Sequence, residues 1–143
     1  MPWPYAAAGF ARGLVTSFIK SVKTEESLWL KTTLLNPLLG LGLLKYPVIT
    51  LPLNIRIYVN NADTLDINIP DMFERREYSL HRGFIPRRGE TVVDVGAYVG
   101  IYSLWSSRLV GDDGMVIAFE PNPETYYWLI NNIKLNNANN IHP

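Results

Sequence analysis

The spacing of apolar residues changes twice along the 143-residue chain, and each pattern predicts a different kind of structure. Near the N-terminus, Leu14, Phe18 and Val22 recur at helical spacing, and further leucines follow as far as Leu44. Prolines then interrupt the pattern. We therefore expect residues 1–53 to form a helical, Leu-rich extension that packs on the domain or, alternatively, dips into a membrane face.

From residue 54 the period of the apolar pattern becomes two. The sequence "NIRIYVNNADTLDINIP", residues 54–70, alternates apolar and polar positions on both sides of a polar break. Such alternation is typical of half-buried strands, so it predicts a short antiparallel pair. The mixed aromatic and charged residues that follow indicate a loop, and residues 54–85 together form the second predicted segment.

After residue 86, short apolar runs replace the alternation. "TVVDV" at residues 91–95 and "MVIAFE" at residues 115–120 are typical of strands that are covered on both faces of a parallel sheet. An apolar stripe between Ile101 and Leu109 predicts a helix that connects them. Residues 86–143 are therefore expected to form a partial, Rossmann-like α/β domain whose first loop lies where such sheets bind ligands.

A second helix and a third strand complete the predicted order. Asn122 is a good N-cap, Pro123 suits the first helical position, and the apolar stripe continues to Ile133. The Asn-rich tail is expected to end this helix, since asparagine favours helix ends and turns. "NIHP" at residues 140–143 looks like the opening of a third strand, so we expect the fold to be truncated there.

Two glycines and two acidic residues surround the loop after the first parallel strand. Gly96 and Gly100 permit a sharp turn and a close approach of the backbone to a ligand. The free amides of the helix that follows favour a carboxylate or phosphate. Asp94 can accept from an ammonium group, and Glu120 can accept from both hydroxyls of a ribose. An amino acid joined to a ribose therefore fits this loop, whereas the dinucleotide fingerprint requires a third glycine.

The stretches "GETVVDVGAYVGIYSLWSS" and "GMVIAFEPNPETYYWLINNIKLNNANNI" resemble the cofactor motifs of FkbM-type methyltransferases, which bind S-adenosylmethionine on a Rossmann-like sheet. The resemblance covers roughly residue 71 to the end of the chain. It implies S-adenosylmethionine as the cofactor, with Asp94, Gly96, Ala97 and Gly100 around its methionine part, Glu120 at the ribose hydroxyls and Asn122 on the adenine side. Tyr98 stands where that family more often has a small polar residue, so we expect its ring to pack beside the sulfonium or to shape the pocket rim.

The chemistry that this resemblance implies is methyl transfer to a hydroxyl oxygen, in which the enzyme mainly positions the reactants. No catalytic base is assigned, because Asp71, Glu74, Glu77 and His81 are each more typical of a solvated loop. Two other functions stay open. One is a noncatalytic interaction module, held at a membrane through residues 34–44, and the other is an NAD-dependent oxidoreductase, against which the missing glycine counts.

Composition and charge narrow the expected partners. Basic and acidic residues number 13 each and form no long block, so the sequence predicts a small-molecule, sugar or lipid hydroxyl acceptor and no nucleic acid. The chain has no cysteine, and His81 and His142 lie far apart, so no metal site is predicted. The N-terminus lacks the early positive charge of a secretory signal, which favours a cytoplasmic location, with peripheral membrane contact as a variant.

The expected end of the fold near its third strand has a physical consequence. The run at residues 91–95 would present an unpaired apolar edge, which promotes aggregation unless the N-terminal extension or a second chain completes the sheet. We therefore expect the chain to be poorly stable by itself and, unless the sheet is completed, inactive as an enzyme.

Overall fold

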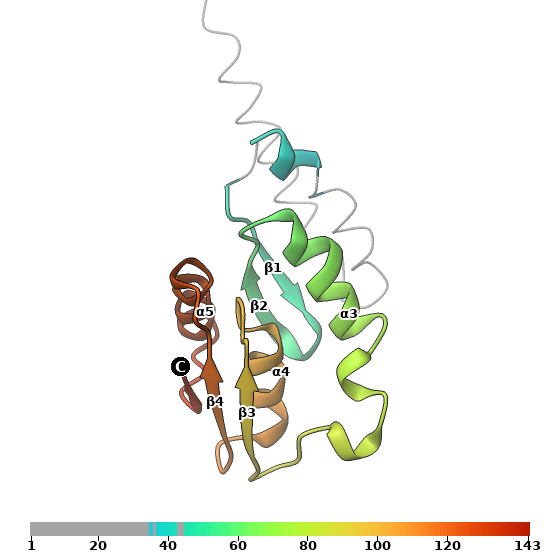
Figure 1. Cartoon of the computed structure of the whole chain (residues 1–143), viewed down its shortest axis with the longest axis vertical. Coiled ribbons are helices and arrows are strands. Elements are labelled where there is room, and N and C mark those ends of the chain that lie inside the picture. The colour runs from blue at the N-terminus through green and yellow to red at the C-terminus, as the bar shows by residue number, and fades with distance from the viewer. Residues whose placement is uncertain (1–34, 36, 43–44) are drawn as a thin grey trace, which may run out of the picture.

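The computed structural model describes residue 35 and residues 37–42 and 45–143 of the chain. The predicted helix around Leu14–Val22 lies outside the described residues, as does most of the 1–53 extension. Among the described residues, no helix has the length and apolar character needed to cross a membrane. The elements are β1 (Val48–Leu51), η1 (Pro52–Asn54), β2 (Ile55–Tyr58), η2 (Thr64–Asn68), α3 (Ile69–Phe73), η3 (Glu77–Ser79), η4 (Arg82–Phe84), β3 (Thr91–Val95), α4 (Ile101–Val110), β4 (Met115–Phe119), α5 (Pro123–Asn136) and β5 (Ile141–His142). Figure 1 labels β1 to β4 and the helices α3, α4 and α5.

A parallel sheet with the strand order β3-β4-β5 confirms the predicted α/β fold. Val95 lies opposite Phe119 at the ends of β3 and β4, and Val116 lies opposite Ile141 where β5 joins. The N–H groups of Gly96 and Ala97 both donate to the carbonyl of Phe119, at 2.8 and 2.9 Å. The loops that follow β3 and β4 therefore lie side by side at the carboxyl end of the sheet.

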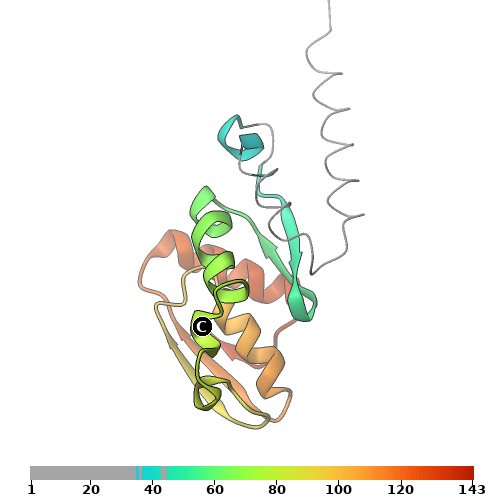
Figure 2. The same ribbon diagram turned by 90° about the vertical axis from the view of Figure 1, so that its right-hand side faces the viewer.

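The two crossover helices cover only one face of this sheet. Figure 2 shows α4 between the parallel sheet and the β1–β2 hairpin, and the side chains that face it, Val116 and Ala118, are buried. On the other face, Val93, Val95 and Phe119 are exposed by 56%, 81% and 56%. The prediction that both faces are covered is thus wrong for the described residues, because successive right-handed crossovers in one direction place both helices on the same side.

Small polar residues allow α4 to lie close against the sheet. Ser103, Ser106 and Ser107 are buried together with the predicted apolar residues, and a Cβ added at Gly114 would lie 2.5 Å from the Cβ of Val110. Ser107 donates to the side-chain oxygen of Asn140 at 2.6 Å, which ties the helix to the start of β5. The close packing of α4 on the sheet therefore depends on small polar residues and a glycine, which the spacing of apolar residues does not reveal.

The β1–β2 hairpin is joined to α5 by two buried asparagines. Asn132 accepts from the N–H of Tyr58 at 2.9 Å, and Asn136 accepts from the N–H of Arg56 at 2.8 Å. Asn136 also donates to the carbonyl of Arg56, and Asn132 donates to the carbonyl of Val99 at 2.9 Å. These amides satisfy the outer edge of β2, which would otherwise be unpaired. They also connect the hairpin to the loop before α4.

The predicted antiparallel pair is displaced along the chain. Ile55–Tyr58 does form a strand, but its partner is the preceding Val48–Leu51, and the expected second strand is a helical segment that covers η2 and α3. Burial shows why: Leu65 and Ile69 are fully buried, whereas Ile67, which a strand would place on the same face, is 50% exposed. Leu65 and Ile69 are four residues apart, which is a helical spacing. The same two residues also fit a strand alternation, so the sequence pattern did not distinguish the two structures.

Candidate active site

The loop of residues 96–100, which we call the cofactor loop, connects β3 to α4 in a conformation that two glycines permit. Gly96 has φ 86° and Gly100 has φ 89°, both in the left-handed region. A Cβ at Gly100 would lie 2.6 Å from Cδ1 of Leu129, so the start of α4 also packs directly on α5. A Cβ at Gly96 would meet nothing within 4 Å. Gly96 is therefore needed for its backbone angle, and the space beside it is open to a ligand.

A cavity of about 60 Å³ lies against the cofactor loop. It is lined by residues of the β3–α4 connection and by three residues of the preceding segment: Asp94, Gly96, Ala97, Tyr98, Ile101 and Tyr102, with Asn68, Met72 and Tyr78 opposite. The enclosed volume suits one end of a ligand, and the remainder of a nucleotide-sized molecule would extend over the surface towards Glu120. Four predicted residues meet here. Asn68, Met72 and Tyr78 were not predicted, because helical and loop residues far away in sequence supply them; Ile101 and Tyr102, which begin α4 directly after the cofactor loop, were not predicted either.

Glu120 fastens the cofactor loop to the end of β4. One carboxylate oxygen accepts from the N–H of Tyr98 at 2.7 Å, and the other accepts from the N–H of Asn122 at 2.9 Å. Partial burial alone would raise the pKa of Glu120. Hydrogen bonds from Asn122, Thr125 and Tyr98 outweigh that effect, so its pKa lies below the ordinary value. Glu120 is therefore a firmly ionised acceptor beside the loop.

Asp94 is the buried carboxylate of the cavity. Only 9% of the residue is exposed, and the hydroxyl of Ser103 donates to its Oδ2. Burial raises the pKa of Asp94. The Ser103 hydrogen bond offsets part of that rise, and the charge of Glu120 adds to it. A cationic group in the cavity would relieve this unfavourable burial, which is the property expected of an ammonium-binding residue.

Tyr98 forms part of the cavity wall and is held from two sides. Its φ of 52° is uncommon for a tyrosine, and Glu120 accepts from its N–H. Its hydroxyl accepts from the side-chain amide of Asn61 at 2.8 Å. The side chain of Tyr98 therefore bridges the cofactor loop and the residues after β2 at the wall of the cavity.

Asn122 caps α5 as predicted. Its side-chain oxygen accepts from the N–H of Glu124 at 2.9 Å and from the N–H of Thr125 at 3.5 Å, and Pro123 follows at the first helical position. Asn122 does not line the cavity, and its oxygen is engaged by the helix. Its side-chain N–H₂ group is the part that can face an adenine.

The acidic residues and histidine considered as bases do not line this cavity. Asp71 forms an ion pair with Arg75, whereas Glu74 and Glu77 are exposed. His81 is also exposed, and its Nδ1 accepts from the N–H of Gly83 at 3.1 Å, so it caps a short turn. Tyr78 is the titratable side chain that the structure adds, but burial and the nearby charge of Asp94 raise its pKa. Its hydroxyl is therefore a hydrogen-bond donor at neutral pH.

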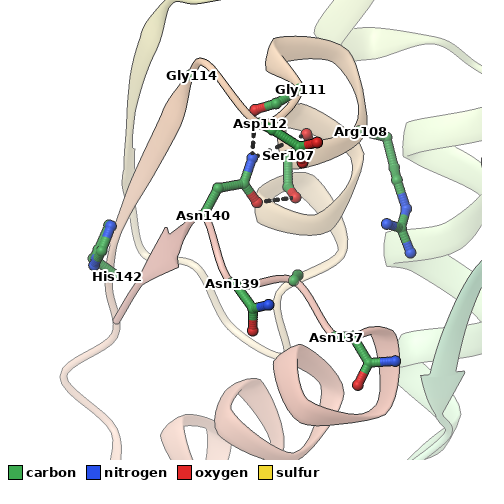
Figure 3. A pocket seen from close by; sticks show the side chains of 10 residues that line it. Ser107, Arg108, Gly111, Asp112, Gly114, Asn137, Asn139, Asn140 and His142 are labelled. Carbon is green, nitrogen blue, oxygen red and sulfur yellow. Dashed lines mark hydrogen bonds between the residues drawn. The ribbon is translucent and has the colours of Figure 1, made fainter.

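A larger cavity of about 520 Å³ lies at the other end of the sheet, near the starts of β4 and β5 (Figure 3). Polar residues line it, including Arg108, Asn139 and His142. Asn140 is not available to a ligand there, since its side chain bonds Ser107 and the carbonyl of Gly111. No predicted cofactor residue lies in this cavity, so its size does not make it the active site.

A parallel sheet with a glycine loop after its first strand and an ionised acid after its second defines the class of this protein. It has the Rossmann-like fold of S-adenosylmethionine-dependent methyltransferases. The family model described as the TRM5/TYW2 methyltransferase domain matches residues 71–143, just over half of the chain. The chain therefore belongs to the TRM5/TYW2 methyltransferase domain family, and its cofactor is S-adenosylmethionine. This family, rather than the FkbM family, is the one that the comparison supports.

Two known proteins are similar to parts of the chain. A tRNA(Phe) (4-demethylwyosine(37)-C(7)) aminocarboxypropyltransferase of Methanocaldococcus jannaschii is 38% identical over 60 residues, which are 42% of this chain and 24% of the relative. The chain thus spans about a quarter of that relative's length. The crystal structure of an S-adenosylmethionine-dependent methyltransferase from Aquifex aeolicus shares 26% identity with a TM-score of 0.39, covering 51% of this chain and 35% of that one.

The expectation of a small-molecule acceptor and no nucleic acid is overturned by these comparisons. The relative from Methanocaldococcus jannaschii is named as a tRNA(Phe) aminocarboxypropyltransferase, so it acts on a nucleic acid. Charge composition did not indicate a nucleic-acid partner, because basic and acidic residues are equal in number and are intermixed along the chain. Five arginines occur between residues 75 and 88, but Asp71, Glu74, Glu77 and Glu90 lie in or beside the same stretch.

Proposed function

We propose that this domain uses S-adenosylmethionine to modify a nucleoside of tRNA. The observation that carries the proposal is the cofactor loop, tied to Glu120, within a sequence that belongs to the TRM5/TYW2 methyltransferase domain family. The tRNA-modifying relative supports the substrate class. When bound, the cofactor would supply an electrophilic carbon attached to a sulfonium.

The residues of the site fit the parts of that cofactor. Glu120 has lone pairs left after its two amide contacts, and these would accept from the ribose hydroxyls. The first-turn amides of α4, beginning at Ile101, have no intrahelical acceptor and would face the carboxylate of the amino acid. Asp94 would accept from the ammonium group. These contacts would hold the reactive carbon beside the cavity mouth, and positioning is the main contribution of the protein to transfer.

Two features of the reaction remain to be proposed: the group that is transferred from the cofactor and the atom of the nucleoside that accepts it. Transfer of the methyl group to a hydroxyl oxygen is our initial expectation, whereas the relative's name describes aminocarboxypropyl transfer to C7 of a base. Cavity residues Asp94, Tyr98 and Tyr78 would surround the part of the cofactor that carries both groups. We favour methyl transfer because the matched family is named for it.

Label transfer tests this proposal. The purified chain is incubated with an unmodified tRNA(Phe) transcript and S-adenosylmethionine labelled either in the methyl group or in the aminocarboxypropyl chain. Nucleosides are then separated after digestion. Methyl label in a nucleoside supports the proposal, and its position on the ribose or on the base decides the acceptor atom. If S-adenosylhomocysteine binds but neither label reaches tRNA, tRNA modification by this chain is rejected while the cofactor assignment stands.

A further inference from the structure

The positive charge of the chain is unevenly distributed. Residues 74–88, which connect α3 to β3, contain five of the 13 basic residues and two acidic ones. Two of these arginines are paired, Arg75 with Asp71 and Arg88 with Asp113. The other three, which we call the arginine strip, are Arg76, Arg82 and Arg87. Each is exposed and forms no ion pair with another described residue.

Exposed rings lie between these arginines. Phe84 is 70% exposed and Tyr78 is 49% exposed, although both are large aromatic side chains. The ring of Phe84 contacts the ring of His81 at a centroid distance of 5.5 Å, which leaves its other face free. Arginines that alternate with exposed rings are a combination that suits nucleic acid, since phosphates and bases both find partners on one surface.

Residues 74–88 also lead to the cofactor cavity. Tyr78 lines the cofactor cavity, and its ring lies 4.9 Å from that of Tyr102 at the start of α4. From there the chain runs down one side of the molecule, past η4, to the beginning of β3 (Figure 2). A ligand lying along residues 74–88 would therefore reach the mouth of the cavity at one end.

We propose that residues 74–88 form an RNA-docking surface that presents a nucleotide to the cofactor cavity. The inference rests on the proposed tRNA function and adds the surface that serves it. Arg82 and Arg87 would contact phosphates, and Phe84 would offer a ring for an unstacked base. Tyr78, at the cavity, would border the base that reacts. An anionic membrane would be attracted by the same arginines, but it contains no bases that could stack on Phe84. Binding to RNA and binding to a membrane can therefore be distinguished.

The test measures binding of an unmodified tRNA(Phe) transcript by the full chain over a range of salt concentrations. The double variant R82Q/R87Q is compared with R108Q/K134Q, which removes the same charge from exposed positions on α4 and α5. Loss of two phosphate contacts lowers the slope of log Kd against log salt by about two. Between about 50 and 200 mM salt, the wild type should then lose roughly 15-fold more affinity than R82Q/R87Q. The control should keep the wild-type slope.

A second variant separates stacking from charge. F84L should weaken tRNA binding by about fivefold or more at every salt concentration while leaving the salt slope unchanged. Calorimetric titration with S-adenosylhomocysteine should give the same affinity for all variants, which shows that each is folded and has an intact cofactor site.

The outcomes are distinct. If tRNA binds equally well to the wild type and to R82Q/R87Q, or if both double variants lose the same slope, the surface is wrong and the proposed function is untouched. If the wild type binds S-adenosylhomocysteine but no tRNA, both the surface and the substrate class are rejected. Binding to anionic vesicles that exceeds binding to tRNA, and that is insensitive to F84L, would assign the arginines to a membrane instead.

Discussion

Replacement of Glu120 by alanine tests the central feature of the site. In the structure each carboxylate oxygen accepts one backbone N–H, from Tyr98 and from Asn122, and retains lone pairs for the two ribose hydroxyls. A hydrogen bond to a charged group contributes about 1.5–3 kcal/mol, and the lower value applies here because Glu120 is only partly buried. Loss of two such bonds removes about 3 kcal/mol, so S-adenosylhomocysteine should bind about 100-fold more weakly.

The assay is isothermal titration of the purified chain with S-adenosylhomocysteine, with NADH as a comparison ligand. Glu120→Gln should bind with intermediate affinity, because an amide oxygen still accepts but carries no charge. Glu124→Ala is the matched control, since it removes an exposed carboxylate from the first turn of α5 and should bind like the wild type. Thermal unfolding of each variant establishes that it is folded.

The reasoning is refuted if Glu120→Ala binds S-adenosylhomocysteine within about threefold of the wild type while remaining folded. That result would mean that Glu120 serves only to fasten the cofactor loop. Tighter binding of NADH than of S-adenosylhomocysteine would contradict the cofactor assignment itself.

Three further substitutions test the packing and electrostatics around the loop. Asp94→Asn should raise Tm at pH 7 by about 2–4 °C while weakening S-adenosylhomocysteine binding, because a carboxylate with a raised pKa destabilises the folded state when ionised; the gain should shrink as pH falls through that pKa and vanish in acid. A gain that persists unchanged at low pH would exclude this cause. Gly100→Ala should cost about 2–4 kcal/mol in denaturant unfolding, from strain and a steric clash, against about 1 kcal/mol for Gly89→Ala, which adds strain alone; equal losses would rule out the clash. Asn132→Ala should cost about 2–4 kcal/mol by leaving buried backbone groups unpaired, whereas Asn131→Ala should cost under about 0.5 kcal/mol, and similar values for the two would dismiss the hairpin linkage.

The order of elements after residue 86 followed from the sequence because each signal there is local. Asn122 and Pro123 mark the start of α5, and the apolar runs mark β3 and β4 without reference to any other part of the chain. The register of parallel strands then brings the cofactor loop beside Glu120. The loop residues could therefore be predicted to converge, and the structure places them together.

The segment before residue 86 was harder to predict because two patterns overlap in it. Leu65, Ile67 and Ile69 satisfy a strand alternation, while Leu65, Ile69 and Met72 satisfy a helical spacing. Only contact with the rest of the domain decides between them, and it buries the helical set. The far wall of the cavity could not be predicted either, because Met72 lies within this overlapping stretch and Tyr78 lies in the loop after it, where no local pattern positions a side chain.

The sequence by itself determined the fold class, the cofactor loop and its acid, since strand runs, helix caps and glycine positions act over a few residues. Tertiary structure alone decided which face of the sheet is covered, that Asn132 and Asn136 join the hairpin to α5, and that Tyr78 borders the cavity. It also decided which arginines of residues 74–88 form no ion pair with another described residue, although the whole chain is neutral. These features depend on contacts between segments far apart in sequence, whose energies appear only when the chain is folded.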